Sequence, residues 1–178
     1  MFKIYVYIFD TLADWELGYV IAELNSGRFF KKDAPRVSVK TVGISKEPVK
    51  TMGGLTIVKK AEELLSVGAT VCAICGATVA LANAGLLDQR PHTSNGTGFL
   101  EMTCPSYKGQ SLYIDKLSVS DHNLITAGAA GALLWTRQII EHLGVFQPDT
   151  LDFWYEFFNT GDPQFFFALM QTLSYTDK

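Results

Sequence analysis

The stretch Thr70-Val71-Cys72-Ala73-Ile74-Cys75-Gly76-Ala77-Thr78-Val79-Ala80-Leu81-Ala82 decides the fold of this 178-residue chain. Its apolar first part is typical of a buried strand that ends at Cys75, and its second part, rich in small residues, is typical of a helix. This order places Cys75 on a sharp strand-to-helix turn, an arrangement that exposes a nucleophile above a sheet. Most buried cysteines are inert core residues, but the positive end of a helix favours the thiolate. We therefore predict a reactive Cys75 with a low thiol pKa.

The other two cysteines, Cys72 and Cys104, have no such position, and an odd count gives no disulfide framework. Cys72 and Cys75 match the redox motif C-x-x-C in letters. In a strand, however, three residues span roughly 10 Å, whereas a disulfide needs Cα atoms within about 7 Å of each other. We predict that Cys72, with an ordinary pKa, and Cys104 are structural.

Upstream of the turn, the pattern alternates between strands and helices. Residues 2–9 are apolar at nearly every position, as in strands of a parallel sheet that is covered on both faces. Residues 17–24 have the apolar spacing of a helix, which Gly27 ends. A second strand is expected within 37–44, and a hairpin with a glycine turn within 47–58.

Downstream, the alternation continues. We expect a helix over 77–84, a helix capped by Ser94 and Asn95 and running through residue 100, strands over 113–119 and 124–127, and a helix over 129–143. Alternating strands and helices predict an α/β sandwich with a mainly parallel sheet.

The last part of the chain, residues 147–178, differs from the α/β part, residues 1–146. Two helices are expected, from about Thr150 and from about Gln164. They are crowded with aromatic residues: Phe153, Trp154, Tyr155, Phe157, Phe158, Phe165, Phe166 and Phe167. Because so many would form a sticky patch if exposed, they pack either on the sheet or against a second subunit, two alternatives that the sequence leaves equal.

Composition narrows the possible partners. A net charge of −3 without a basic cluster gives no reason to expect binding of nucleic acid or of an acidic membrane surface. The chain has no apolar run of about 18 residues that would span a bilayer, and its first residues lack the cleavage site of a signal peptide. We expect a cytoplasmic protein without a cofactor or metal, since no His/Cys/Asp cluster has ligand spacing.

Glu16 is the candidate partner of Cys75. It lies early in the first helix, beyond the carboxyl end of the first strand, and sites in open α/β sheets lie along that edge. An ordinary solvated helix glutamate is the alternative. Of the histidines, His92 follows the nucleophile helix and has a plausible route to the site as an accessory residue, whereas His122 lies in a tight turn and His142 in a last helical turn.

Several motifs occur in an order that resembles the ThiJ/PfpI family of the class I glutamine amidotransferase-like superfamily. They are Phe9-Asp10, Asp14-Trp15-Glu16-Leu17, Met52-Gly53-Gly54, Ala73-Ile74-Cys75-Gly76-Ala77, Ala84-Gly85-Leu86-Leu87-Asp88 and Leu124-Ile125-Thr126-Ala127-Gly128. The resemblance runs from residue 2 to about residue 144. It implies a flavodoxin-like three-layer α/β/α sandwich, frequent dimers, and a reactive Cys75 held by Glu16.

Two departures from the family pattern bear on function. Many peptidase-like members carry a histidine directly after the cysteine, where this chain has Gly76, and no late histidine precedes a glutamate by two residues as glutaminases require. Both protease and glutaminase activity are therefore disfavoured. The family also has a strand ending in Pro-Gly-Gly before the nucleophile strand, which is absent at Val58-Lys59-Lys60-Ala61. We expect missing residues there, with a chain break between about Val58 and Glu62.

Two functions remain open. In the first, Cys75 attacks a small electrophile or amide, Glu16 positions or shuttles a proton, and backbone amides near Gly76 stabilise the oxyanion. Family activities of this type include peptidase, glyoxalase or deglycase, and isonitrile hydratase, and the implied partners are a small-molecule substrate and a second copy in a homodimer. In the second, the protein is a non-catalytic, redox-responsive stress protein or chaperone in which Cys75 is oxidised.

Overall fold

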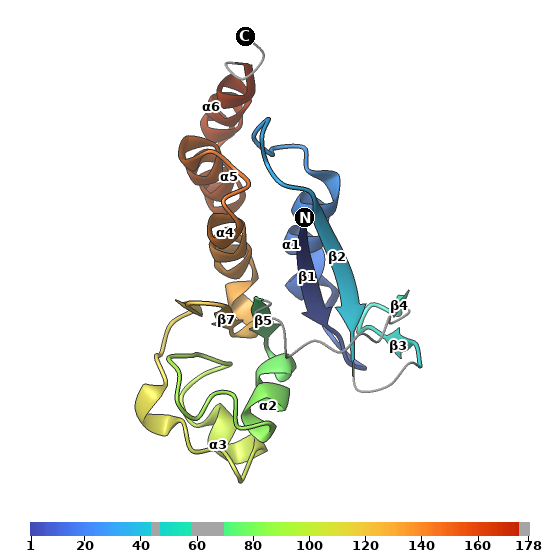
Figure 1. Cartoon of the computed structure of the whole chain (residues 1–178), viewed down its shortest axis with the longest axis vertical. Coiled ribbons are helices and arrows are strands. Elements are labelled where there is room, and N and C mark those ends of the chain that lie inside the picture. Colours follow the sequence, from blue (N-terminus) through green and yellow to red (C-terminus); the bar gives the residue numbers. More distant parts are fainter. Residues whose placement is uncertain (44–46, 58–69, 175–178) are drawn as a thin grey trace.

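The computed structural model describes residues 1–43, 47–57 and 70–174, and its centre is a five-stranded sheet (Figure 1). The strand order is β2-β1-β5-β7-β6. The strands are β1 (Phe2–Tyr7), β2 (Val37–Val42), β5 (Val71–Ile74), β6 (Ser118–Asp121) and β7 (Leu124–Ala127). All neighbours are parallel except β6, which pairs antiparallel with β7. The mainly parallel sheet expected from the sequence is confirmed.

Helices cover both faces of the sheet. Alternate residues of β5 and β7 belong to different cores: Ile74 and Ile125 pack with the helices α1 (Asp14–Ser26) and α4 (Ala132–Leu143), whereas Val71 and Leu124 pack with α2 (Gly76–Asn83) and with residues that follow it. Since successive side chains of a strand point to opposite faces, these are the two outer layers of a three-layer α/β/α sandwich. The flavodoxin-like architecture is therefore confirmed.

Several predicted boundaries shift for local reasons. The helix expected at 94–100 is absent, because Gly96 (φ 141°) and Gly98 (φ 86°) take backbone conformations outside the helical region, and α3 runs instead over Phe99–Thr103. The strand expected at 113–119 is largely an irregular segment after a 3₁₀ turn, Gln110–Leu112, and β6 begins only at Ser118. A second 3₁₀ turn, Ala129–Gly131, precedes α4.

The predicted glycine hairpin is present as β3 (Val49–Lys50) and β4 (Thr56–Ile57), which pair antiparallel. Asp14 fixes it to the start of α1. Its carboxylate accepts hydrogen bonds from the Thr51 hydroxyl at 2.6 Å and from the backbone N–H of Gly53 at 2.7 Å. These bonds lower the pKa of Asp14. The hairpin is thereby fixed beside the helix that carries Glu16.

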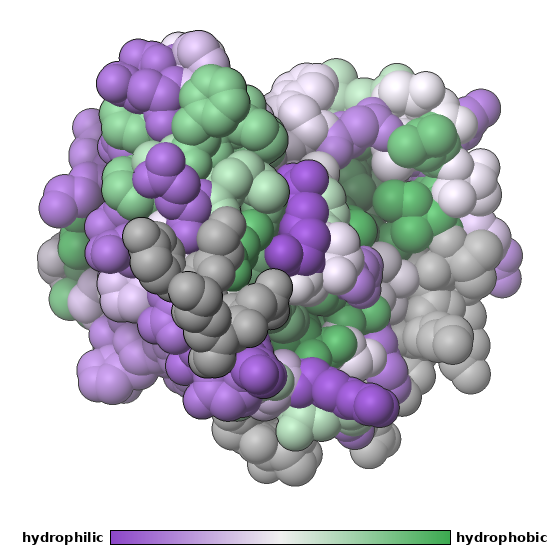
Figure 2. All heavy atoms as spheres, turned by 90° about the horizontal axis from the view of Figure 1, so that it is seen from above, coloured by the Kyte–Doolittle hydropathy of each residue, from purple (hydrophilic) through white to green (hydrophobic). Residues whose placement is uncertain are grey.

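The aromatic tail forms α5 (Pro148–Thr160) and α6 (Pro163–Ser174), two helices that pack on each other, with α5 against α4. Trp154 is fully buried in the main core, so part of the tail packs on the α/β part. Phe167 remains 64% exposed and Met170 42% exposed. Hydrophobic atoms also reach the surface among hydrophilic ones in the view from above (Figure 2).

The nucleophile strand β5 is central, as expected, but it pairs directly with β1. Only two residue pairs, Tyr5 with Val71 and Val6 with Cys72, form this contact. Among the described residues no strand lies between β1 and β5. The chain break expected between Val58 and Glu62 lies outside the described residues.

Candidate active site

Cys75 occupies the turn between β5 and α2 and has a strained backbone, as predicted. Its φ of 54° and ψ of −125° are rare for a residue with a side chain. The turn is held by its own backbone groups. The N–H of Cys75 donates to the carbonyl of Ala127 at 3.0 Å, and the Cys75 carbonyl accepts from the Thr78 hydroxyl at 2.6 Å. A constrained turn of this kind fixes the direction of the sulfur.

Glu16 lies at this turn and is in hydrogen-bond contact with the Cys75 thiol. The predicted proximity of the two side chains is confirmed. The carboxyl comes from the first part of α1. Glu16 is only 1% exposed, although a glutamate carboxyl is normally charged and in contact with water. Among the described residues, its buried Oε2 has no hydrogen-bond partner.

Burial sets the protonation of this pair. It raises the pKa of Glu16, and it also raises the pKa of Cys75, contrary to the low value that we predicted. The helix terminus expected to lower the thiol pKa is outweighed because the sulfur is half-buried and next to a carboxyl. Both pKa values are raised, so burial favours the protonated form of each group over its anion.

Asn95 is the site residue that the sequence did not reveal. Its Nδ2 donates to the Cys75 sulfur at 3.4 Å, and its Oδ1 accepts from the backbone N–H of Ala129 at 2.9 Å. The sequence suggested a helix cap at this position, so the polar residue was assigned a local role. Only the fold brings residues 92–96 beside the nucleophile turn.

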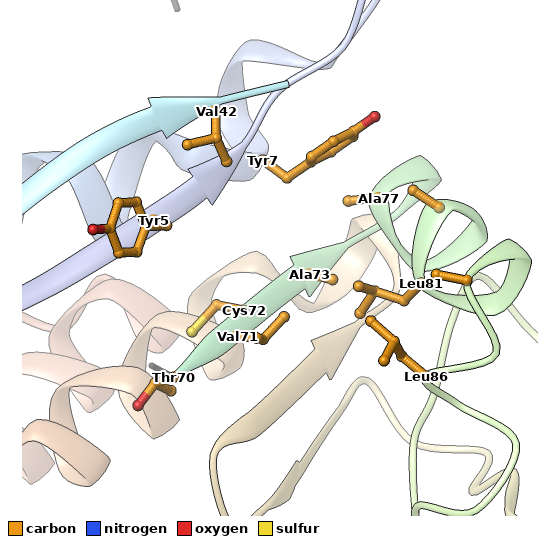
Figure 3. A pocket seen from close by; sticks show the side chains of 12 residues that line it. Tyr5, Tyr7, Val42, Thr70, Val71, Cys72, Ala73, Ala77, Leu81 and Leu86 are labelled. Atoms are coloured by element: carbon orange, nitrogen blue, oxygen red, sulfur yellow. The ribbon is translucent and has the colours of Figure 1, made fainter. Parts of the chain in front are cut away.

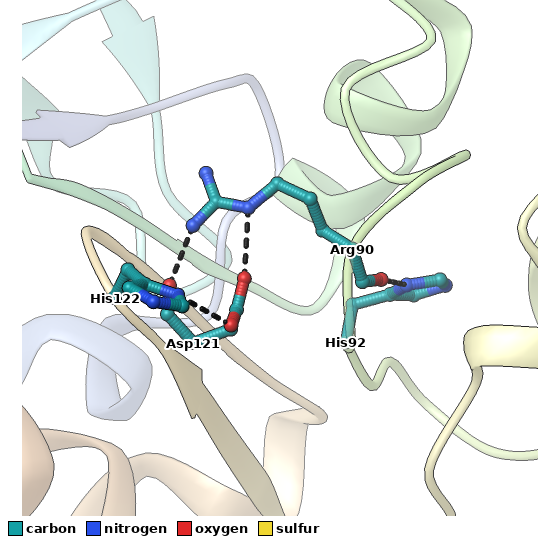
Figure 4. Close-up of polar contacts among 4 residues, drawn as sticks. All are labelled: Arg90, His92, Asp121 and His122. Carbon is teal, nitrogen blue, oxygen red and sulfur yellow. Dashed lines mark hydrogen bonds and ion pairs between the residues drawn. The ribbon is translucent and has the colours of Figure 1, made fainter.

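The structure does not bring His92 to Cys75. The imidazole is fully buried: Nδ1 donates to the carbonyl of Arg90 at 2.6 Å, so Nε2 accepts from the Tyr107 hydroxyl at 2.5 Å. Figure 4 shows the imidazole bonded to the backbone of Arg90 and directed away from the Asp121 and His122 side chains, which interact with each other and with the Arg90 side chain. Since both ring nitrogens are occupied, His92 has a structural role in the loop that carries Asn95.

Gly76 leaves room for the Phe9 ring directly after the cysteine. A Cβ atom at this position would lie 2.9 Å from the ring of Phe9. The backbone N–H of Gly76 is directed at the Cys75 sulfur and lowers its pKa. This group was expected to stabilise an oxyanion, and here it contacts the nucleophile itself.

A cavity and an open depression lie near β5. An apolar cavity of about 220 Å³ lies beside β5, between β1 and α2, and is lined by Tyr5, Tyr7 and Val71 (Figure 3), but Cys75 does not line it. A more open depression of about 580 Å³ is lined by Asn95, Asp115 and Lys116 among others. Cys75 does not line this depression either, but Asn95, which contacts the sulfur, does.

Other kinds of site have no support in the described part of the chain. Residues 1–43, 47–57 and 70–174 contain no group of three or more His, Cys, Asp or Glu side chains that could hold a metal ion. Across the same residues, no helix is both long enough and apolar enough to cross a membrane.

The fold and the site together define an α/β protein with a cysteine on a nucleophile elbow and a buried helix carboxyl beside it. The family model of the DJ-1/PfpI family matches residues 55–142. The uncharacterized protease YoaZ of Bacillus subtilis is 42% identical over 205 aligned positions, which cover 97% of this chain and 98% of the relative. The chain belongs to the DJ-1/PfpI family, as the ThiJ/PfpI resemblance implied.

Solved structures agree with this assignment. A ThiJ/PfpI family protein from Bacillus anthracis is 40% identical, with a TM-score of 0.87 and coverage of 95% of both chains. The DJ-1 superfamily protein Atu0886 from Agrobacterium tumefaciens has the same fold, with a TM-score of 0.73 at 22% identity over 89% of this chain and 97% of its own.

The alignment with YoaZ is longer than this chain: 205 positions against 178 residues. The relative therefore has residues that this chain lacks.

Proposed function

We propose that this protein is a Cys75-dependent enzyme of the hydrolase, glyoxalase or hydratase type that acts on a small electrophile or amide. The observation that carries the proposal is the sulfur of Cys75, held on a strained turn in contact with the buried carboxyl of Glu16. Catalytic nucleophiles need such constrained, partly exposed positions beside a proton acceptor.

The chemistry follows from the contact between the thiol and the carboxyl, which lets a proton pass from one group to the other. As the sulfur attacks an electrophilic carbon, the thiol proton moves to the Glu16 carboxylate, and a carbon–sulfur bond forms. With an amide, the displaced electron pair goes to the carbonyl oxygen and then re-forms the carbonyl as the carbon–nitrogen bond breaks; the amine leaves with the proton from Glu16, and water hydrolyses the thioester to the acid and the free thiol. With an α-oxoaldehyde, the oxygen takes that proton, a proton shift between the two carbons gives a thioester, and water hydrolyses it in the same way. With an isonitrile, the carbon takes the proton, and water displaces the thiol to leave an N-substituted formamide.

The surroundings favour a small substrate. The depression next to Asn95, at about 580 Å³, falls within the range of small-molecule sites. Its rim carries one exposed group of each charge, Asp115 and Lys116, so it has no strong preference for a charged ligand. The protease name of the Bacillus subtilis relative supports a hydrolase, while the missing histidine after Cys75 favours small substrates over peptides.

The test is a substrate panel, with methylglyoxal, an isonitrile, small amides and a casein-type peptide, run against the wild type and Cys75→Ser. We expect turnover of at least one small substrate, with a loss of about 100-fold or more in Cys75→Ser. Cys72→Ala serves as the matched control and retains turnover. Stoichiometric oxidation of Cys75 without turnover of any substrate would overturn the proposal in favour of a redox-responsive stress protein.

A further inference from the structure

The side-chain amide of Asn95 is held in one orientation. Its Oδ1 accepts the N–H of Ala129 at 2.9 Å, so Nδ2 is the atom turned toward the Cys75 sulfur, at 3.4 Å. The reversed amide would place two donors, Nδ2 and the Ala129 N–H, against each other. Because Nδ2 can only donate, the sulfur must accept, and a sulfur accepts a hydrogen bond best as a thiolate.

The loop that carries Asn95 is fixed to the nucleophile turn by a second contact. The buried hydroxyl of Ser94 lies 2.6 Å from the hydroxyl of Thr78, which also donates to the carbonyl of Cys75 at 2.6 Å. Close packing adds to this constraint, since a Cβ on Gly128 would lie 2.6 Å from the carbonyl oxygen of Ser94. Loop and turn therefore move together, and the distance from Asn95 to the sulfur is set by the fold.

Among the described residues, the charged or titratable groups near the sulfur, apart from Glu16, bind other partners or face away from it. Glu16, from α1, is the titratable side chain in contact with the thiol. From the same helix, Asp14 is occupied by Thr51 and Gly53. His92, in the loop itself, is directed away and doubly bonded. Asp115 and Lys116 are exposed at the depression beyond Asn95.

We infer that Asn95 is a positioning residue whose side-chain amide holds the Cys75 sulfur as a hydrogen-bond acceptor. The inference rests on the proposed role of Cys75 as nucleophile. It means that the thiolate is stabilised by neutral donors, Asn95 and the Gly76 N–H, and that Glu16, among the described residues, can receive the thiol proton. The pH dependence of Cys75 reactivity should then show no imidazole ionisation.

The test is the pH profile of Cys75 alkylation by iodoacetamide, followed by peptide mass spectrometry on the full chain, for wild type, Asn95→Ala and Asn95→Asp. We expect Asn95→Ala to alkylate about 3- to 10-fold more slowly at pH 7, with its midpoint shifted upward, since one donor is lost. Asn95→Asp places an anion near the sulfur, and we expect a larger loss, of about 10- to 100-fold.

Asn83→Asp is the matched control, because Asn83 accepts a hydrogen bond from the Cys104 thiol, away from the site. It should leave the Cys75 profile unchanged. Asn95 is exposed, so its truncation to alanine opens no buried cavity and the variant should fold. If both Asn95 variants kept the wild-type midpoint and rate while folded by circular dichroism, the inference would be overturned.

This experiment needs no substrate, so it fails separately from the proposed function. A shifted profile without any turnover would leave Asn95 as the residue that sets sulfur reactivity and would reject the enzyme. Turnover that depends on Cys75, together with an unshifted profile, would keep the enzyme and reject the role of Asn95.

Discussion

A cysteine in the interior of β5 and a cysteine at its end have different environments and different roles. Cys72 lies within the strand and is 4% exposed, and burial raises its pKa to about 12, so the ordinary pKa that we predicted is wrong. Cys75, three residues later, leaves the regular strand at a positive φ and meets Glu16, Asn95 and the N–H of Gly76. The comparison shows that backbone conformation at the strand end, more than the residue itself, separates a structural thiol from a candidate nucleophile.

The largest expected difference is in alkylation. At neutral pH, iodoacetamide should label Cys75 on the order of 100-fold faster than Cys72, because the thiolate reacts and the interior thiol is both inaccessible and hard to ionise. Peptide mass spectrometry of a time course gives both rates in one sample. Equal rates for the two thiols would remove the distinction on which the site assignment depends.

For stability we expect the opposite order: substitution should lower the free energy of unfolding more at Cys72 than at Cys75. Cys72→Ser places a hydroxyl in the apolar core without an evident partner, and we expect it to lower the free energy of unfolding by about 1–3 kcal/mol. Cys75→Ser, at a half-buried polar site, should cost less than about 1 kcal/mol. Urea unfolding of both variants, with Cys72→Ala to separate polarity from volume, measures the difference. A more destabilising change at Cys75 would contradict this reading.

The buried carboxyl at the strand end should also make stability depend on pH. Because burial raises the pKa of Glu16 above its usual 4.5, the folded state binds the proton more tightly than the unfolded chain. This contribution to stability is present below pH 4.5 and is lost as the pH rises through the folded-state pKa.

Glu16→Gln removes this ionisation, so the variant should lose less stability than the wild type between pH 5 and pH 8 in urea titrations. Glu47→Gln changes an exposed carboxyl and should follow the wild type. Parallel curves for wild type and Glu16→Gln would show that the carboxyl is not held in its neutral form by the fold.

Much of the fold could be predicted from the sequence because local signals agreed with it. The apolar run 71–74 followed by small residues gave the turn, and Gly27, Gly144 and Gly161 ended their helices in left-handed conformations. The pairing of Glu16 with Cys75 could be predicted because the carboxyl ends of parallel strands share one edge.

The features that could not be predicted depend on contacts between segments that are far apart in the sequence. Ser94 and Asn95 have the letters of a helix cap, and only the approach of their loop to Cys75 and Ala129 gives them another role. The thiol pKa depended on burial as well as on the helix terminus, and burial is not visible in a local pattern. His92 was misjudged for the same reason, since Tyr107, which occupies its Nε2, lies 15 residues away.

The smallest expected effect concerns Gly76, which tests how tightly the strand end is packed. Gly76→Ala would bring a Cβ to 2.9 Å from the outer edge of the Phe9 ring. The half-buried ring can move, and alanine is the better helix former. The cost of moving the ring and the gain in helix propensity nearly cancel, so we expect a change of less than about 1 kcal/mol in unfolding free energy. Gly18→Ala, in α1 with no atom near its Cβ, should stabilise by about 0.5–1 kcal/mol.

A double-mutant cycle with Phe9→Leu isolates the contact between residues 9 and 76. The smaller side chain removes the ring edge, so Gly76→Ala should be more favourable in that background than in the wild type, with a coupling of about 0.5–1 kcal/mol. Additive changes would mean that Phe9 does not restrict the position after the nucleophile. The glycine would then have to be explained by the backbone of the turn alone.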